Sequence, residues 1–320
     1  MNFNRTFIIN FAVYFAAMAA IMLWLGWGKP MMLLGLFFTA GLAIGSLYAL
    51  GGIGMVVLYR ATGVLNFSAG AAGAAGAMIS WQIVQWGLWP PLAWLAGIAV
   101  ALVLTLAYGR WLAPLLAYRD TVVKAVATLG FALIILGLTS YAWHDDPRAL
   151  ELPTDSIKVQ MLGFSVTGTR LLAFGFSVAI VIGIWQFLER TDIGLKLRAV
   201  ANDRDLSGLL GIPILRVETM AWTIAGLLAG FTGLMFANLV RLQPAVITFM
   251  VIPSIAAALV GRLNNSALVL LGGLSMGVIE SMLTLSPELK GVRPIAPFVI
   301  AAIVLLYSQR GQRLSFADKN

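Results

Sequence analysis

The residues of this chain that could move a solute or a proton are few, and they stand inside long apolar runs. Glu280 is the only acid within such a run, and an intramembrane carboxylate is costly enough to suggest function. A hydrated or paired position near the end of the run is the plain alternative. Polar residues beside Gly-rich or turn-containing stretches are further pathway candidates, because a broken helix exposes backbone groups there. These candidates are Asn66, Ser68, Asn238 and Gln243, together with Gly70 of the Gly-rich stretch.

Enzymatic, metal and nucleotide chemistry find little support in the residue types. The chain has no cysteine and one histidine, His144, which stands beside Asp145 and Asp146 without a second histidine to share a metal. No Gly-x-x-x-x-Gly-Lys-Ser/Thr phosphate loop is present, so the chain cannot bind a nucleotide by that route. We therefore expect no metal, no cofactor and no catalytic residue, with a single serine-based site as the enzymatic alternative that stays open.

Composition places these residues in a membrane protein. The chain has 320 residues, of which 60% are hydrophobic and 11% charged, against about 25% charged in an ordinary soluble domain. Its net charge of +8 comes without a basic patch interleaved with aromatic residues, so we expect membrane lipid around the chain and no nucleic acid.

The apolar runs predict one all-α domain over residues 1–320 with about ten transmembrane helices. Each run is long enough to cross about 30 Å of hydrocarbon at about 1.5 Å per residue. The predicted spans are 7–27, 31–58, 64–85, 91–109, 122–143, 169–188, 219–239, 245–261, 266–285 and 294–308.

Basic residues predict the orientation. With ten spans, fourteen Lys and Arg residues fall in the loops and tails on one side and seven on the other, and the richer side faces the cytoplasm. Both termini are therefore expected in the cytoplasm. The polar loop 144–169 is expected in the periplasm, and the loop 189–218 in the cytoplasm.

Two segments suggest an inverted repeat. Residues 58–80 and 239–261 align so that Arg60 meets Arg241, each before a turn-containing segment and an Ala-rich stretch. The predicted topology puts the two arginines on opposite sides of the membrane, as an inverted repeat requires.

The loop 189–218 predicts short helices with an exposed apolar face. Asn202 or Asp203 can cap the second helix, and Gly211 with Pro213 can end it. Leu206, Leu209, Leu210 and Ile212 give it apolar residues, which indicates a docking surface for another protein. A helix lying on the membrane surface is the alternative.

Several motifs resemble those of branched-chain amino-acid ABC permeases, and the stretch Gly63-Val-Leu-Asn-Phe-x-x-Gly70 resembles the LivH-type subunit. The other similar stretches are 41–50, 76–78, 194–199, 211–212, 225–233, 259–266 and 272–281. Departures are Ser68-Ala69, Gly261-Arg262 and Ser308-Gln-Arg-Gly311, where relatives often carry Ala-His or Ala-Gln, Gly-Gly and Pro-x-Gly. The first departure leaves the solute open among branched-chain and other amino acids, urea, amides and aromatic acids.

The resemblance implies a permease of the bacterial inner membrane that works with ABC ATPase subunits, and these partners would bind ATP and magnesium. It also implies a second, LivM-like permease and a periplasmic solute-binding protein as partners. The expected coupling residues are Gly194, Arg198, Ala199, Asn202, Asp203, Leu206, Leu209, Leu210 and Gly211. An ion-gradient-driven secondary transporter is the alternative, but it predicts more buried acids than Glu280 alone.

Overall fold

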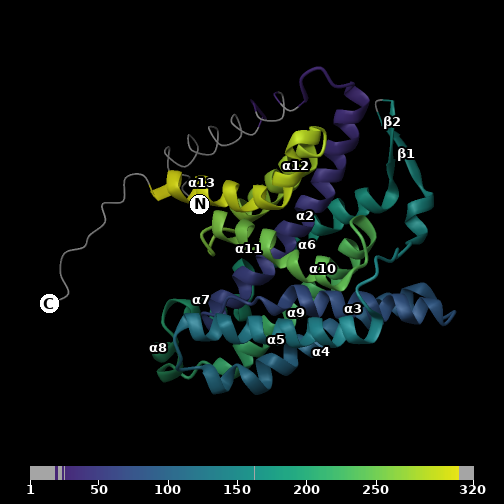
Figure 1. Ribbon diagram of the computed structural model, residues 1–320. Helices are drawn as coiled ribbons and strands as arrows, with labels where there is room; N and C mark the ends of the chain where they lie inside the picture. The colour runs from purple at the N-terminus through teal and green to yellow at the C-terminus, as the bar shows by residue number, and fades with distance from the viewer. Residues whose placement is uncertain (1–18, 21–23, 25, 162, 310–320) are drawn as a thin grey trace.

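The computed structural model describes residues 19–20, 24, 26–161 and 163–309, which form a helical bundle with one small hairpin (Figure 1). Its helices are α2 (Met31–Thr62), α3 (Ser68–Gln85), α4 (Pro90–Ala107), α5 (Thr121–Trp143), α6 (Gly168–Arg190), α7 (Asp192–Asn202), α8 (Arg204–Leu209), α9 (Ile214–Leu239), α10 (Pro244–Phe249), α11 (Val251–Val260), α12 (Ser266–Leu283) and α13 (Ala296–Gln309). The π-helical turn Tyr108–Leu112 extends α4, and short 3-10 turns cover Pro114–Leu116, Pro153–Ser156 and Pro287–Ile295. The strands β1 (Lys158–Met161) and β2 (Phe164–Thr167) pair antiparallel, with Lys158 opposite Thr167.

Six of the described helices are long and apolar enough to cross a membrane: α2, α4 with its extension, α5, α6, α9 and α12. The structure thus confirms a mostly helical membrane protein, whereas ten spans and the side of the termini stay predictions. The predicted span 7–27 lies largely outside the described residues. The predicted span 294–308 corresponds to α13, whose 14 residues reach about 21 Å.

The predicted continuous span 245–261 is wrong in one respect, because the structure divides it into α10 and α11 at Met250. Pro253 explains the break. It has no backbone N–H, and its ring would collide with the carbonyl of Phe249 in a continuous helix. The predicted span 64–85 begins later, at Ser68, because Gly63 ends α2 in the left-handed conformation with φ of +68° and residues 64–67 form a turn.

The helices form two groups that α2 joins. Helices α3, α4, α5 and α9 lie side by side in the lower half of Figure 1, and α11, α12 and α13 lie in the upper half. Helix α2 packs against α9 in the first group and against α11 and α12 in the second. Its 32 residues extend about 48 Å, more than the hydrocarbon thickness.

Glycines allow the closest helix crossings. An added Cβ on Gly277 of α12 would collide with the backbone of Gly45 in α2, and one on Gly233 of α9 would collide with the backbone of Gly73 in α3. Direct backbone contact replaces side-chain interdigitation at these crossings, as is common between membrane helices.

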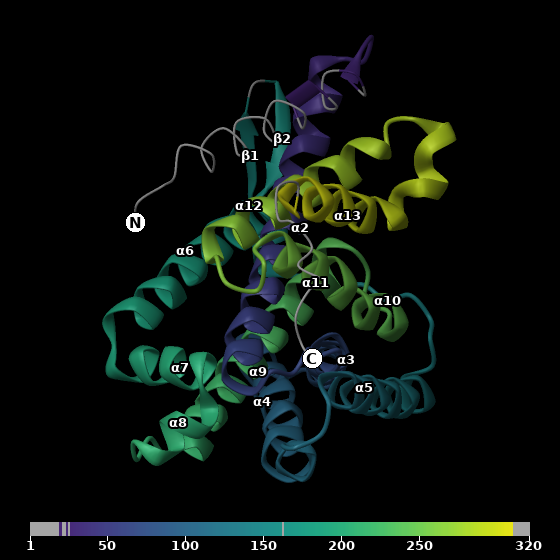
Figure 2. The ribbon, with the colours of Figure 1, turned by 90° about the vertical axis from the view of Figure 1, so that its left-hand side faces the viewer.

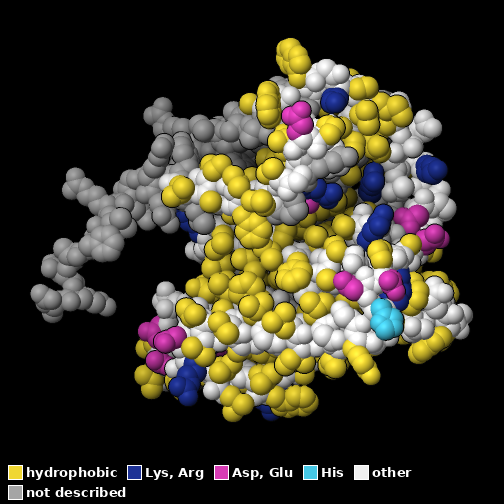
Figure 3. Space-filling view, viewed as in Figure 1, with side chains coloured by type: hydrophobic (Ala, Val, Ile, Leu, Met, Phe, Trp, Pro, Cys, Tyr) yellow, Lys and Arg dark blue, Asp and Glu magenta, His cyan; other side chains and the backbone are white. Residues whose placement is uncertain are grey.

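The loops gather at two opposite ends of the bundle. Helix α6 descends on the left of Figure 2 and turns at its lower end into α7 and α8, whereas the hairpin lies at the top. We refer to these as the α7–α8 end and the hairpin end. In Figure 3, most visible charged side chains lie over the lower left and along the right edge, and apolar side chains cover the surface between them.

Candidate functional site

The α7–α8 end presents an exposed apolar surface on a firmly anchored base. Leu197 and Val200 bury the inner face of α7, and Gly194 packs so closely on the last turn of α6 that a side chain there would collide with Leu188. Arg204 at the start of α8 forms an ion pair with Glu218 of α9, with 2.9 Å between Nη2 and Oε1. The base of this end is therefore tied to two long helices.

The apolar surface itself belongs to α8 and the residue after it. Of the two predicted caps, Asn202 and Asp203, the structure has Asp203, whose Oδ1 accepts the N–H of Leu206 at 2.9 Å. Leu206, Leu209 and Leu210 are 51%, 86% and 74% exposed. We call these three residues the α8 docking surface, after the role that the sequence predicts for them.

The remaining predicted coupling residues lie around this surface. The carbonyl of Ala199 accepts the N–H of Asp203, which closes α7. Gly211 adopts φ of +80°, which glycine allows without strain, and turns the chain toward α9. Arg198 and Asn202 instead line a cavity behind α7.

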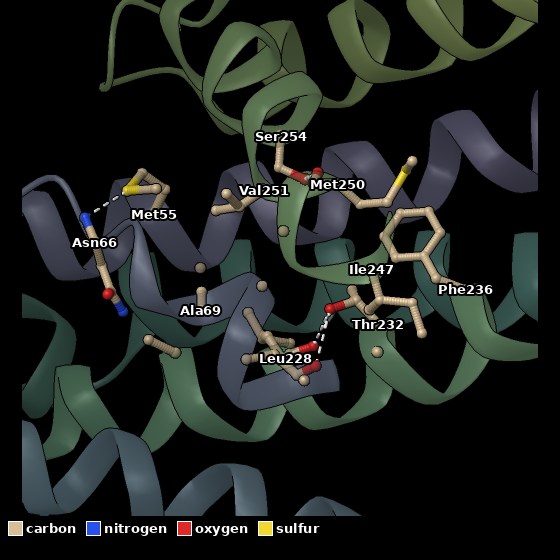
Figure 4. Close-up of a pocket in the computed structure, with 17 residues that line it drawn as sticks. Met55, Asn66, Ala69, Leu228, Thr232, Phe236, Ile247, Met250, Val251 and Ser254 are labelled. Carbon is tan, nitrogen blue, oxygen red and sulfur yellow. Dashed lines mark hydrogen bonds between the residues drawn. The ribbon is translucent and has the colours of Figure 1, made fainter. Parts of the chain in front are cut away.

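A second feature is a small cavity where α2, α3, α9, α10 and α11 meet (Figure 4). Its volume is about 30 Å³, which is room for about one water molecule. Thr232 and Ser254 face it, but their hydroxyls donate to carbonyls of their own helices, at Leu228 and Met250. The wall is therefore largely apolar.

Two of the predicted pathway residues, Asn66 and Gly70, line this cavity, and Ser68 lies beside it. Asn66 Oδ1 accepts the backbone N–H and the hydroxyl of Ser68, at 3.0 and 2.7 Å, while its buried Nδ2 has no partner among the described residues. A Cβ on Gly70 would collide with the carbonyl of Thr248 in α10. The turn before α3 and the break before α11 thus meet, although the proposed inverted repeat stays a prediction.

The other two polar candidates lie at the hairpin end and hold the loop 144–168 against the bundle. Asn238 Nδ2 donates to the carbonyl of Leu150 at 2.8 Å and to Asp155 Oδ2 at 2.7 Å. Gln243 Nε2 donates to the carbonyl of Asp145 at 3.0 Å, and Asp145 Oδ1 accepts the N–H of Ala245 in the first turn of α10. Neither amide is among the residues that line the small cavity.

Removing the Asp155 carboxylate should loosen this loop. Asp155 also accepts the N–H of Leu152 at 2.8 Å and the hydroxyl of Thr169 at 2.6 Å. In Asp155→Ala, partly buried donors lose a charged acceptor. We therefore expect the free energy of unfolding to fall by about 3 kcal/mol and proteolytic cleavage within 144–168 to become faster. Thermal unfolding and limited proteolysis in detergent measure both. Asp146→Ala, at an exposed carboxylate of the same loop, should leave both unchanged; equal sensitivity of the two variants would contradict this assignment.

Glu280 is buried within a polar network. Its Oε2 accepts the hydroxyl of Tyr48 at 2.7 Å, and its Oε1 pairs with Nε of Arg293 at 3.0 Å. The side chain is 6% exposed and does not line the small cavity. The geometry matches the paired alternative for this acid.

Sequence reasoning did not single out Tyr48, Asp155 and Arg293 as members of these networks. Tyr48 lies 232 positions from Glu280 in the chain, so no local pattern joins them. For Asp155 a signal existed, because an acid three residues after Leu152 and directly after Thr154 has the spacing of a short capped turn.

Apolar helices long enough to cross a membrane, close glycine crossings and loops gathered at two ends define a polytopic membrane protein. Residues 37–307 match the family of branched-chain amino acid transport system/permease components, and the chain belongs to that family. It is thus a multi-pass protein of the inner membrane, and its relatives are transport subunits.

Named relatives cover most of the chain. The probable branched-chain amino acid transport permease protein LivH of Methanocaldococcus jannaschii is 27% identical, over 72% of this chain and 75% of its own length. The high-affinity branched-chain amino acid transport system permease protein BraD of Pseudomonas aeruginosa is 25% identical, over 85% of this chain and 92% of its own. The fructose import permease protein FrcC of Rhizobium meliloti is 23% identical, over 84% of this chain and 76% of its own length.

Proposed function

We propose that this chain is the membrane-spanning subunit of an ATP-driven importer and that it receives force from ATPase subunits through the α8 docking surface. The exposed leucines carry this proposal. Apolar residues 51–86% exposed on a helix outside the lipid-length segments favour a protein partner. Their base continues directly into α6 and α9, so a push on α8 reaches two long helices.

The charge distribution supports a cytoplasmic position for this surface. Of the basic residues in the described part of the chain, ten lie in or beside the connections at the α7–α8 end and seven at the hairpin end. The richer end faces the cytoplasm under the positive-inside rule. We therefore propose that the loop 144–168 faces the outside and meets the solute-binding protein.

The solute we propose is a branched-chain or similar small amino acid. The small cavity offers an apolar wall and one unpartnered amide, which suits an aliphatic side chain better than a sugar whose hydroxyls would go unpaired. Since about 30 Å³ is too small for such a solute, transport requires α3 to separate from α10 and α11. A second, homologous permease subunit would complete the membrane part of the importer.

The energy source tests this function against a secondary transporter. Cells carrying the tagged chain should take up labelled leucine in the presence of an uncoupler as long as ATP is maintained, and an ATPase subunit should copurify with the tag. Uptake of labelled fructose is measured in the same cells to test a sugar as the alternative solute. Uptake that stops with the uncoupler at unchanged ATP would overturn the proposal in favour of an ion-gradient mechanism.

A further inference from the structure

A large basic cavity lies at the α7–α8 end, behind the docking surface. Its volume is about 980 Å³, and its walls come from the end of α2, the start of α5, the end of α6, the α7–α8 segment and the turn between α11 and α12. Segments far apart in the sequence thus meet around one hollow. The cations that line it are Arg60, Lys124, Arg198, Arg204 and Arg262.

The cavity carries an excess of positive charge. Against its five cations stands one lining carboxylate, Glu189, whose Oε1 already accepts the indole N–H of Trp185 at 2.9 Å. Arg204 forms an ion pair with Glu218, and the same carboxylate attracts Lys124. Like charges gathered around one cavity raise its potential and attract anions.

The backbone holds two of these cations in place. Arg60 donates from Nη2 to the carbonyl and the side-chain oxygen of Asn264, which ties the end of α2 to the α11–α12 turn. Arg262 and Leu263 in that turn have φ of +52° and +53°, a conformation that costs free energy in residues other than glycine. The turn thus keeps a strained backbone at the point where Arg262 lines the cavity.

We propose that this cavity binds a phosphate-bearing anion, supplied either by the headgroup of an acidic phospholipid or by a soluble phosphate compound. Guanidinium groups match phosphate oxygens in geometry and charge, and Arg60, Arg198 and Arg262 come from three different segments around one space. Tyr59, Trp185 and Leu188 add an apolar side to the wall, against which the glycerol and first carbons of a lipid fit. The site is separate from the small cavity between α3 and α10 and from the α8 docking surface.

The test uses the purified full-length chain and two probes. Native mass spectrometry counts phosphatidylglycerol retained from nanodiscs that mix it with phosphatidylcholine, and titration with inorganic pyrophosphate in phosphatidylcholine nanodiscs measures the soluble anion. The pocket variant combines Lys124→Gln with Arg262→Asn, because asparagine tolerates the left-handed conformation. The control combines Arg110→Gln with Arg216→Gln, which removes the same charge from exposed positions at the same end.

We expect the pocket variant to bind its anion at least about tenfold more weakly and the control variant to bind as the parent does. Loss of retained phosphatidylglycerol identifies a lipid, and loss of pyrophosphate binding identifies a soluble phosphate compound. Equal losses in both variants, or no binding of either probe to the parent, overturn the site. Unchanged anion binding with weaker copurification of the ATPase would also overturn it, because the cavity would then receive an acidic segment of that partner.

Discussion

Replacing Leu209 and Leu210 together by aspartate should lower ATP-driven uptake at least about 100-fold while leaving the chain folded in the membrane. Each side chain is more than 70% exposed, so neither substitution buries a charge within the chain. In a protein interface, however, a central apolar anchor commonly contributes at least about 2 kcal/mol. Two carboxylates placed there would also lose solvent on docking. We expect uptake and stimulated ATP hydrolysis to fail together.

A matched control separates docking from a general effect of charge. Leu115 is 77% exposed and lies at the same end, in the connection before α5. Leu115→Asp should retain uptake and copurification of the ATPase, and both variants should unfold at the temperature of the parent chain. Normal uptake by the double aspartate variant would remove the proposed role of α8.

Glu280→Ala should destabilise the chain by about 3–5 kcal/mol, the usual cost of removing one partner from a buried ion pair. It leaves the Tyr48 hydroxyl and the Arg293 guanidinium without their carboxylate partner, and Tyr48 is 1% exposed. The unfolding midpoint in detergent measures the effect. The control Glu288→Ala removes an exposed acid from the adjacent 3-10 turn and should shift the unfolding midpoint very little.

A combined variant distinguishes a structural acid from a transporting one. Tyr48→Phe, Glu280→Leu and Arg293→Leu together replace the network by apolar side chains, and such replacements are often neutral or stabilising. If the network only supports the fold, stability and uptake should both return toward the parent values. Restored stability with absent uptake would show that Glu280 acts on a solute or an ion, as the secondary-transporter alternative requires.

The sequence predicted helices well where the need to satisfy the backbone in lipid determines them. It predicted them poorly where contacts with residues distant in the sequence determine them. Apolar runs had to become helices because a single segment in lipid can satisfy its backbone hydrogen bonds only as a helix, and the bounds of α5 and α12 follow the runs closely. Asp203 was one of the two predicted helix caps because it stands just before the apolar residues that begin with Leu206. Pro253 already indicated the break at Met250. The prediction of one continuous span gave more weight to the apolar character of the segment than to this proline.

The candidate site was only partly predictable. Asn66 and Gly70 stood out because they interrupt apolar sequence near a turn, and they do line a cavity. Asn238 and Gln243 showed the same pattern but bind Asp155 and Asp145 across long chain separations. A polar residue at the end of a span has the same local sequence pattern whether it lines a cavity or binds a loop. Only the tertiary fold decides between these two positions.

The glycine crossing between α2 and α12 has a kinetic consequence. Where Gly45 and Gly277 bring backbone against backbone, no rotamers are frozen when the helices meet, and none must be exchanged when one helix slides along the other. Such a contact differs from the side-chain packing of Val278 and Met282 against Leu34, Phe37 and Leu42 farther along the same helices. If the transport cycle moves α12 along α2, the glycine crossing itself would demand no exchange of rotamers, and the resistance to sliding would come from the side chains around Val278 and Met282.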